Sequence, residues 1–148
     1  MLASAGHAED GPTRAEYVSQ VEPICQANTD ANKRILKNAL PKARSKDQRQ
    51  VSEAGAQFIH ASTVFGATTQ KIAAVPRPVA DDARLLKWFK YLGIIKTNLR
   101  NLGKALKAGN KIKAAHEQIR VERSANAANN ASFIFEFKAC RLERSRFT

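Results

Sequence analysis

The chain has 148 residues, of which 43% are hydrophobic, and its 25 lysines and arginines against 13 acidic residues give a formal net charge of +12. This length and composition suit one domain with one core, and no apolar run approaches the roughly 20 residues of a transmembrane helix. The charge favours anionic partners such as anionic lipid, an anionic cell-wall polymer or nucleic acid. Because net charge alone names no ligand, solubility would explain it equally well.

The N-terminal stretch 1–12 contains glycine, proline and small residues and shows no apolar period, which predicts a disordered tail. Small residues just before Glu9 resemble the end of a signal peptide. The stretch is therefore either the remnant of an export signal or an ordinary disordered tail. Thr13 and Glu16 then form a capping-box pattern, so we expect a single folded domain over 13–148.

A first helix is predicted over about 13–39, because apolar residues recur there every three or four positions. They are Tyr17, Val21, Ile24, Ala31, Ile35 and Ala39. Asn28 falls within this stripe and Asn32 lies at its edge. Pro23 lies inside the helical period and predicts a kink or the start of a second segment, and Pro41 is expected to end the helix.

A second helix is predicted from about residue 45 or 47 to Ala74. Its large apolar side chains recur every seven residues, which is typical of a bundle seam. They are Val51, Phe58, Phe65 and Ile72. The stretch 75–78 is expected to end this helix, because it contains two prolines.

The stretch 84–113 organises the chain, because its apolar and basic residues follow the same helical period on opposite faces. The apolar stripe comprises Leu85, Trp88, Leu92, Ile95, Leu99, Leu102 and Leu106. The basic face comprises Lys96, Arg100, Lys104, Lys107 and Lys111. Asp81 and Asp82 suit the start of this third helix, and residues 108–110 suit its end.

This cationic helix has two interpretations. As an isolated segment, residues 84–108 resemble a membrane-surface helix, whereas in a bundle the apolar face is needed for the core and the basic face remains outside. A second group of cations surrounds the first interhelical loop. It comprises Lys33, Arg34, Lys37, Lys42, Arg44, Lys46 and Arg49. No nucleic-acid motif accompanies these residues, so nucleic acid is a less favoured partner than an anionic envelope polymer or lipid surface.

A fourth helix is predicted over about 110–133. Its stripe comprises Ile112, Ala115, Ile119, Asn126, Asn130 and Phe133, with Arg123 on the same face. Helical and two-residue periods both fit residues 133–140, which are therefore either a last helical turn or an extended tail. Four long helices with short connections predict an all-α fold, an antiparallel up-down-up-down four-helix bundle.

Cys25 lies near the start of the first helix, and Cys140 lies near the end of the C-terminal segment. In an up-down-up-down bundle these positions share one end of the molecule, so the only two cysteines are predicted to form a disulfide. An oxidising compartment outside the cytoplasm would follow. The alternative is two unconnected buried thiols in a cytosolic protein.

The run TRAEYVSQVEPICQAN, with Tyr17, the Ile-Cys pair at 24–25 and Asn28, resembles the opening of a broad group of uncharacterised exported bacterial helical proteins. Those proteins carry a second cysteine near the C-terminus, after an apolar–basic–small run similar to the one at 137–140. Glu136 stands where the group often has glycine. The resemblance covers mainly the two ends of the chain and implies export, a bundle and a disulfide, without supplying an activity.

The sequence contains no recognisable catalytic set, no glycine-rich phosphate loop and no metal-ligand spacing, so we expect neither an enzyme nor a cofactor or metal site. The one suggestive constellation is polar and predicted to be interior. It comprises Asn28, Asn32, Arg123, Asn126 and Asn130. These side chains are expected to form either a buried network that fixes helix register or a small polar pocket with Arg123 as an anion anchor.

The favoured function is an exported, disulfide-bonded helical bundle that acts as a non-enzymatic binding or structural module at the cell envelope. One alternative is a basic protein that binds nucleic acid or another polyanion. A second is a membrane-surface-active protein that acts through residues 84–108. The sequence names neither a ligand nor an oligomeric state.

Overall fold

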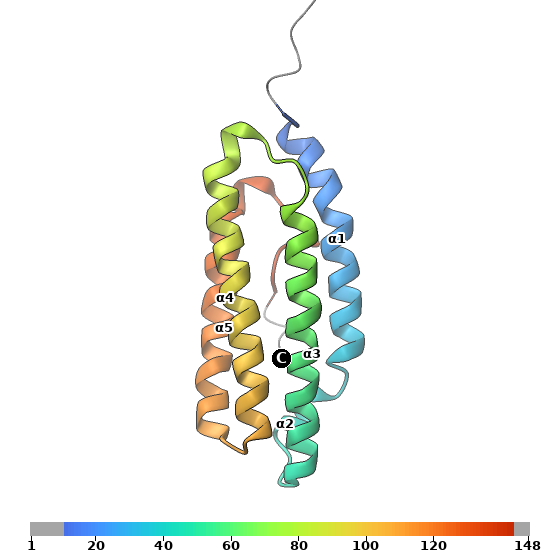
Figure 1. Ribbon diagram of the computed structural model, residues 1–148, viewed down its shortest axis with the longest axis vertical. Helices are drawn as coiled ribbons and strands as arrows, with labels where there is room; N and C mark the ends of the chain where they lie inside the picture. The colour runs from blue at the N-terminus through green and yellow to red at the C-terminus, as the bar shows by residue number, and fades with distance from the viewer. Residues whose placement is uncertain (1–10, 144–148) are drawn as a thin grey trace, which may run out of the picture.

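The computed structural model describes residues 11–143, which are mainly helical and contain no strand (Figure 1). The long helices in this range are α1 Arg14–Ile35, α3 Gln48–Ala73, α4 Asp82–Lys107 and α5 Lys111–Ala131. The short elements are α2 Ala39–Ala43 and the 3-10 turns η1 Val79–Asp81 and η2 Phe133–Phe135. The prediction of an all-α protein with four long helices is confirmed. The predicted tail 1–12 falls mostly on residues 1–10, which lie outside the described residues.

Three of the long helices, α1, α3 and α5, begin with a side-chain cap near the starts that the sequence predicts, whereas Asp81 at the start of α4 makes no capping hydrogen bond. The Thr13 hydroxyl accepts from the Glu16 N–H at 3.2 Å, while the Glu16 carboxylate accepts from the Thr13 N–H at 2.7 Å, which completes a capping box. Asp47 and Asn110 each cap a helix through one side-chain oxygen, at the starts of α3 and α5. Gly109 follows the end of α4 with a φ of 71°, a backbone conformation that suits glycine.

Of the two prolines near the first helix, Pro41 does not act as predicted, and Pro23 does not start a second segment. Pro23 lies within α1, which continues through it as one element, so no second segment starts there. The prediction that Pro41 ends the first helix is wrong. The chain leaves α1 earlier, turns at Asn38 with a φ of 61°, and places Pro41 in the first turn of α2, where a missing N–H costs little. The side-chain amide of Gln57 donates to the Ile35 carbonyl at 2.8 Å and so satisfies the end of α1.

The core lies between helices that pack side by side: α3 contacts both α1 and α4, and α5 contacts α4. Figure 1 shows the chain descending α1, ascending α3, descending α4 and ascending α5. The seven-residue seam of α3 and the apolar stripe of α4 are both buried, as predicted. Helices α3 and α4 lie close together at Gly55 and Gly103, where a Cβ built on either glycine would lie 2.5 Å from the carbonyl oxygen of the other.

The prediction of which face of α5 is buried is wrong. The predicted apolar residues Ile112, Ile119 and Phe133 are 76%, 46% and 76% exposed. The face that α5 buries is built largely of small side chains. It comprises Ala114, Glu117, Val121, Ala125 and Ala128. Alanines let the helix lie close to α4, whose leucines and isoleucines already fill the core, so the large side chains of α5 stay outside.

The C-terminal segment, residues 133–143, follows α5 and contacts both α5 and α1 (Figure 1). It begins with η2, which ends at Glu136 in the left-handed conformation, with a φ of 51°. The remainder has no regular secondary structure. The segment therefore combines one short 3-10 turn with an irregular tail, whereas the sequence left open a last helical turn or an extended tail.

Candidate functional site

Cys25 on α1 and Cys140 in the C-terminal segment form a disulfide, with an S–S distance of 2.02 Å and a Cα–Cα distance of 4.9 Å. The predicted pairing is confirmed. Both residues are buried, at 8% and 2% exposure. Cys140 lies beyond the end of α5, so the irregular C-terminal segment, and not α5 itself, carries it to Cys25.

Two further side chains hold the backbone of the C-terminal segment, and the sequence predictions missed both. The Glu22 carboxylate accepts hydrogen bonds from the N–H groups of Lys138 at 2.7 Å and Ala139 at 2.6 Å. The Asn129 side chain exchanges two bonds with Leu142, accepting from its N–H at 2.8 Å and donating to its carbonyl at 2.7 Å. The position of Glu22, three residues before Cys25, is the one sequence signal for a shared helix face.

Aromatic side chains pack the same segment onto the bundle. Phe137 stacks on Phe135 with ring centroids 5.3 Å apart and on Trp88 of α4 at 5.0 Å. Phe135 also meets Tyr17 of α1 at 6.0 Å, and the Arg14 guanidinium lies 5.7 Å from the Phe135 ring centroid. Aromatic pairs at such distances stabilise beyond their buried area. Covalent, polar and aromatic contacts therefore hold the C-terminal segment against α1, α4 and α5.

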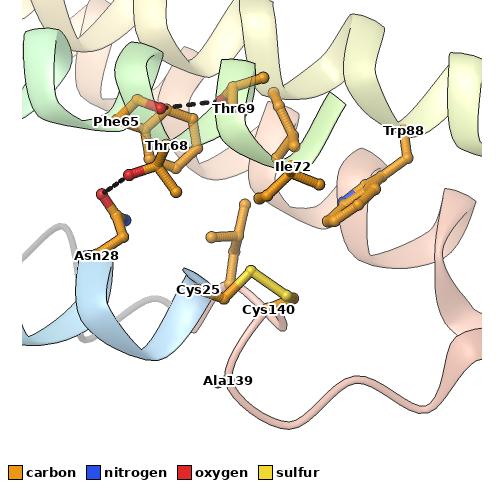
Figure 2. Close-up of a pocket in the computed structure, with 11 residues that line it drawn as sticks. Cys25, Asn28, Phe65, Thr68, Thr69, Ile72, Trp88, Ala139 and Cys140 are labelled. Carbon is orange, nitrogen blue, oxygen red and sulfur yellow. Dashed lines mark hydrogen bonds between the residues drawn. A yellow bond between two sulfur atoms is a disulfide. The ribbon is translucent and has the colours of Figure 1, made fainter. Parts of the chain in front are cut away.

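A small cavity lies beside the disulfide (Figure 2). The figure shows the Cys25–Cys140 bridge on one side of it, with Ile72 and Trp88 nearby. Asn28 lies at its edge and accepts a hydrogen bond of 3.1 Å from the Thr68 hydroxyl. The volume is about 20 Å³, which holds roughly one water molecule and excludes an organic ligand.

The predicted polar constellation does not assemble. Arg123, Asn126 and Asn130 are exposed on α5, because that helix buries another face than the one predicted. Asn28 is half-buried and pairs with Thr68 of α3, and Asn32 is buried with its Oδ1 lacking a hydrogen-bond partner. The structure therefore contains no polar pocket or network made of these five residues.

The predicted basic residues all lie at the surface. Lys96, Arg100, Lys104 and Lys107 are exposed on α4. Lys111 is exposed too, but it belongs to α5 and donates a hydrogen bond of 3.0 Å to the Ser45 carbonyl. Because the apolar stripe of α4 is buried in the core, this helix offers its cationic face, and not an apolar one, to the surroundings.

The surroundings shift the pKa values of two side chains, Tyr17 in the first turn of α1 and Asp81 of η1, which pairs with Arg14. Arg14 donates two hydrogen bonds of 2.9 Å to the Asp81 carboxylate, and this pairing lowers the pKa of Asp81 below its ordinary value of 3.8. Burial raises the pKa of Tyr17 to about 12, and its hydroxyl has no hydrogen-bond partner. Tyr17 belongs to the hydrophobic core, and Asp81 is 4% exposed and paired, which indicates a structural role for each.

Within residues 11–143, no group of three or more His, Cys, Asp or Glu side chains is placed to hold a metal ion. None of the helices in this range is both long and apolar enough to cross a membrane. Comparison of the chain with protein-family models, curated proteins and solved structures finds no match. The functional interpretation therefore depends on the sequence and on the geometry of the structure.

Proposed function

We propose that the protein is an exported, disulfide-bonded four-helix bundle with up-down-up-down topology, which acts as a non-enzymatic binding or structural module at the cell envelope. The observation that carries this proposal is the Cys25–Cys140 disulfide. Disulfides persist in oxidising compartments and are rare in the cytosol. The bridge is buried and supported by Glu22 and Asn129 on either side, which fits a structural bond rather than an exposed redox pair. The resemblance to exported bacterial proteins with terminal cysteines agrees with this assignment.

The exposed cations favour an anionic partner, for which an envelope polymer or lipid surface is our first choice. The second candidate function is cytosolic binding of nucleic acid or another polyanion, and the same exposed cations favour it. A membrane-active role for α4 finds less support, because its apolar stripe already serves the core. Salt-dependent DNA binding by the reduced protein would distinguish the second candidate from the first.

Cell fractionation tests the proposed location. The protein, detected by antibody in cells that express it from its own gene, is expected in the fraction outside the cytoplasm. Alkylation of that fraction before and after reduction should show two cysteines that react only after reduction. Recovery of the protein from the cytosol with both thiols free would contradict the proposal and favour the polyanion-binding alternative.

A further inference from the structure

The bundle is incompletely covered at the end where α1 and α4 terminate and α3 and α5 begin. Helix α1 stops at Ile35, short of the level that the other long helices reach (Figure 1). The five-residue α2 lies in this region and contacts α3, but it is too short to replace a full helix. A pocket of about 280 Å³, open to solvent, remains between α2, α3, α4 and α5.

The floor of this pocket is apolar. Phe58, Leu102 and Leu106 line it, and each is at most 5% exposed over the whole residue. Alanines and a leucine from α2 and α5 form most of the remaining wall. They are Leu40, Ala43, Ala114 and Ala115. A volume near the lower end of the roughly 300–1,000 Å³ of small-molecule sites suits one alkyl chain better than a folded partner.

Two cationic side chains, Arg44 and Lys111, line the pocket, and its lining contains no acidic residue. Arg44 is exposed and its guanidinium makes no ion pair or hydrogen bond within residues 11–143. Lys111 donates one hydrogen bond to the Ser45 carbonyl, which leaves further ammonium donors free. The same end of the bundle carries many more exposed or half-buried cations. They include Lys37, Lys42, Lys46, Arg49, Lys107 and Lys113.

We propose that this pocket binds a free single-chain anionic amphiphile, a medium-chain fatty carboxylate, with its alkyl chain on the Phe58–Leu102–Leu106 floor and its carboxylate at Arg44 and Lys111. An apolar floor without a cationic rim would not select an anion, and a cationic rim without the floor would not select an alkyl chain. The pocket lies between helices, so it takes one chain rather than a bilayer surface. This inference rests on the proposed binding-module function and names its ligand class.

Calorimetric titration of the full, disulfide-bonded chain with decanoate below its micelle concentration tests the proposal. We expect one site per chain. Affinity should rise about three- to fourfold for each added methylene in the series from hexanoate to decanoate, because each is removed from water. Decanol, which has the same chain without the charge, should bind roughly tenfold more weakly.

Matched variants separate the pocket from general surface charge. The double variant Arg44→Gln/Lys111→Gln should weaken decanoate binding roughly tenfold, whereas Arg100→Gln/Lys104→Gln removes the same charge from α4 outside the pocket and should leave affinity within about twofold. Ala115→Phe keeps every charge and fills the pocket from an exposed position, so it should also weaken binding at least tenfold. Circular dichroism confirms that each variant is folded.

Equal weakening in both double variants, unchanged binding by Ala115→Phe, or affinity independent of chain length would overturn the proposal. Binding to vesicles of anionic phospholipid without binding of monomeric decanoate would overturn it as well. If decanoate does not bind to the disulfide-bonded protein, the pocket proposal is refuted and the proposed location outside the cytoplasm is unaffected. If decanoate binds but the protein is found reduced in the cytosol, the pocket proposal stands and the proposed location is refuted.

Discussion

The Glu22 carboxylate accepts a hydrogen bond of 2.6 Å from the backbone N–H of Ala139, 117 residues farther along the chain. Its other oxygen accepts from the N–H of Lys138, so one side chain satisfies two successive amides. Glu22 lies three residues before Cys25, on the same side of α1. A charged acceptor and a covalent bond therefore hold adjacent points of the C-terminal segment, in a part of the chain without regular hydrogen bonding.

Replacing Glu22 by glutamine should reduce the free energy of unfolding by about 1–2 kcal/mol, because hydrogen bonds to a charged acceptor are lost and the new NH₂ faces a backbone N–H. Urea denaturation measures the loss, and hydrogen exchange at Lys138 and Ala139 should accelerate. The control is Glu53→Gln, since the Glu53 side chain is 61% exposed and, within residues 11–143, forms an ion pair with Lys42 alone. A loss no larger in Glu22→Gln than in the control would contradict the assigned role.

Glycine substitutions test the close approach of α3 and α4. In Gly103→Ala the new Cβ would lie 2.5 Å from the Gly55 carbonyl oxygen, so the helices must separate, at a cost of about 2–3 kcal/mol. Gly93→Ala on the same helix meets nothing within 4 Å and should instead stabilise by about 0.5–1 kcal/mol through helix propensity. Thermal unfolding of the two variants should shift in opposite directions, and a shift in the same direction would refute the packing described.

The Arg14–Asp81 pair should make stability fall in acid. Because the pKa of folded Asp81 lies below its ordinary value of 3.8, the contribution is complete above about pH 4 and is lost as the pH falls through the folded pKa. Asp81→Asn removes this dependence. The difference in unfolding free energy between the native chain and Asp81→Asn, measured by urea denaturation, should shrink below pH 4. A difference that is constant from pH 7 to pH 2 would show that the pair does not titrate as described.

Tyr17 should make stability fall in alkali. Its pKa is raised from 10.0 to about 12, so between these values the unfolded chain releases a proton that the folded chain retains. Across that window the native chain should lose about 2–3 kcal/mol more than Tyr17→Phe. At pH 7 the two proteins should differ by less than about 1 kcal/mol, because the tyrosine hydroxyl has no partner. Parallel pH profiles from pH 9 to pH 12 would argue against this assignment.

Local signals in the sequence predict most of the fold. The capping residues Thr13, Asp47 and Asn110 mark where helices start, because each satisfies N–H groups within its own first turn. The pairing of Cys25 with Cys140 is also predicted from the sequence, because the expected helix count and short loops would place both cysteines at one end. These features depend on neighbouring residues or on topology alone.

The features that the sequence did not predict depend on tertiary packing. Periodicity favoured the large residues Ile112 and Ile119 as the core face of α5, whereas close packing on α4 selects alanines. The contacts of Glu22 and Asn129 join side chains to irregular backbone, which leaves no periodic trace. The pocket beside Arg44 exists because α1 ends early, and that end depends on a turn whose position the sequence did not reveal.

The most direct test of the account is a peptide map of the protein isolated from its native source, alkylated while denatured and never reduced. We predict no alkylated cysteine and one cross-linked species that joins the Cys25 peptide to the Cys140 peptide. Two alkylated thiols and no cross-linked species would contradict the fastening of the C-terminal segment to α1 and the export argument with it.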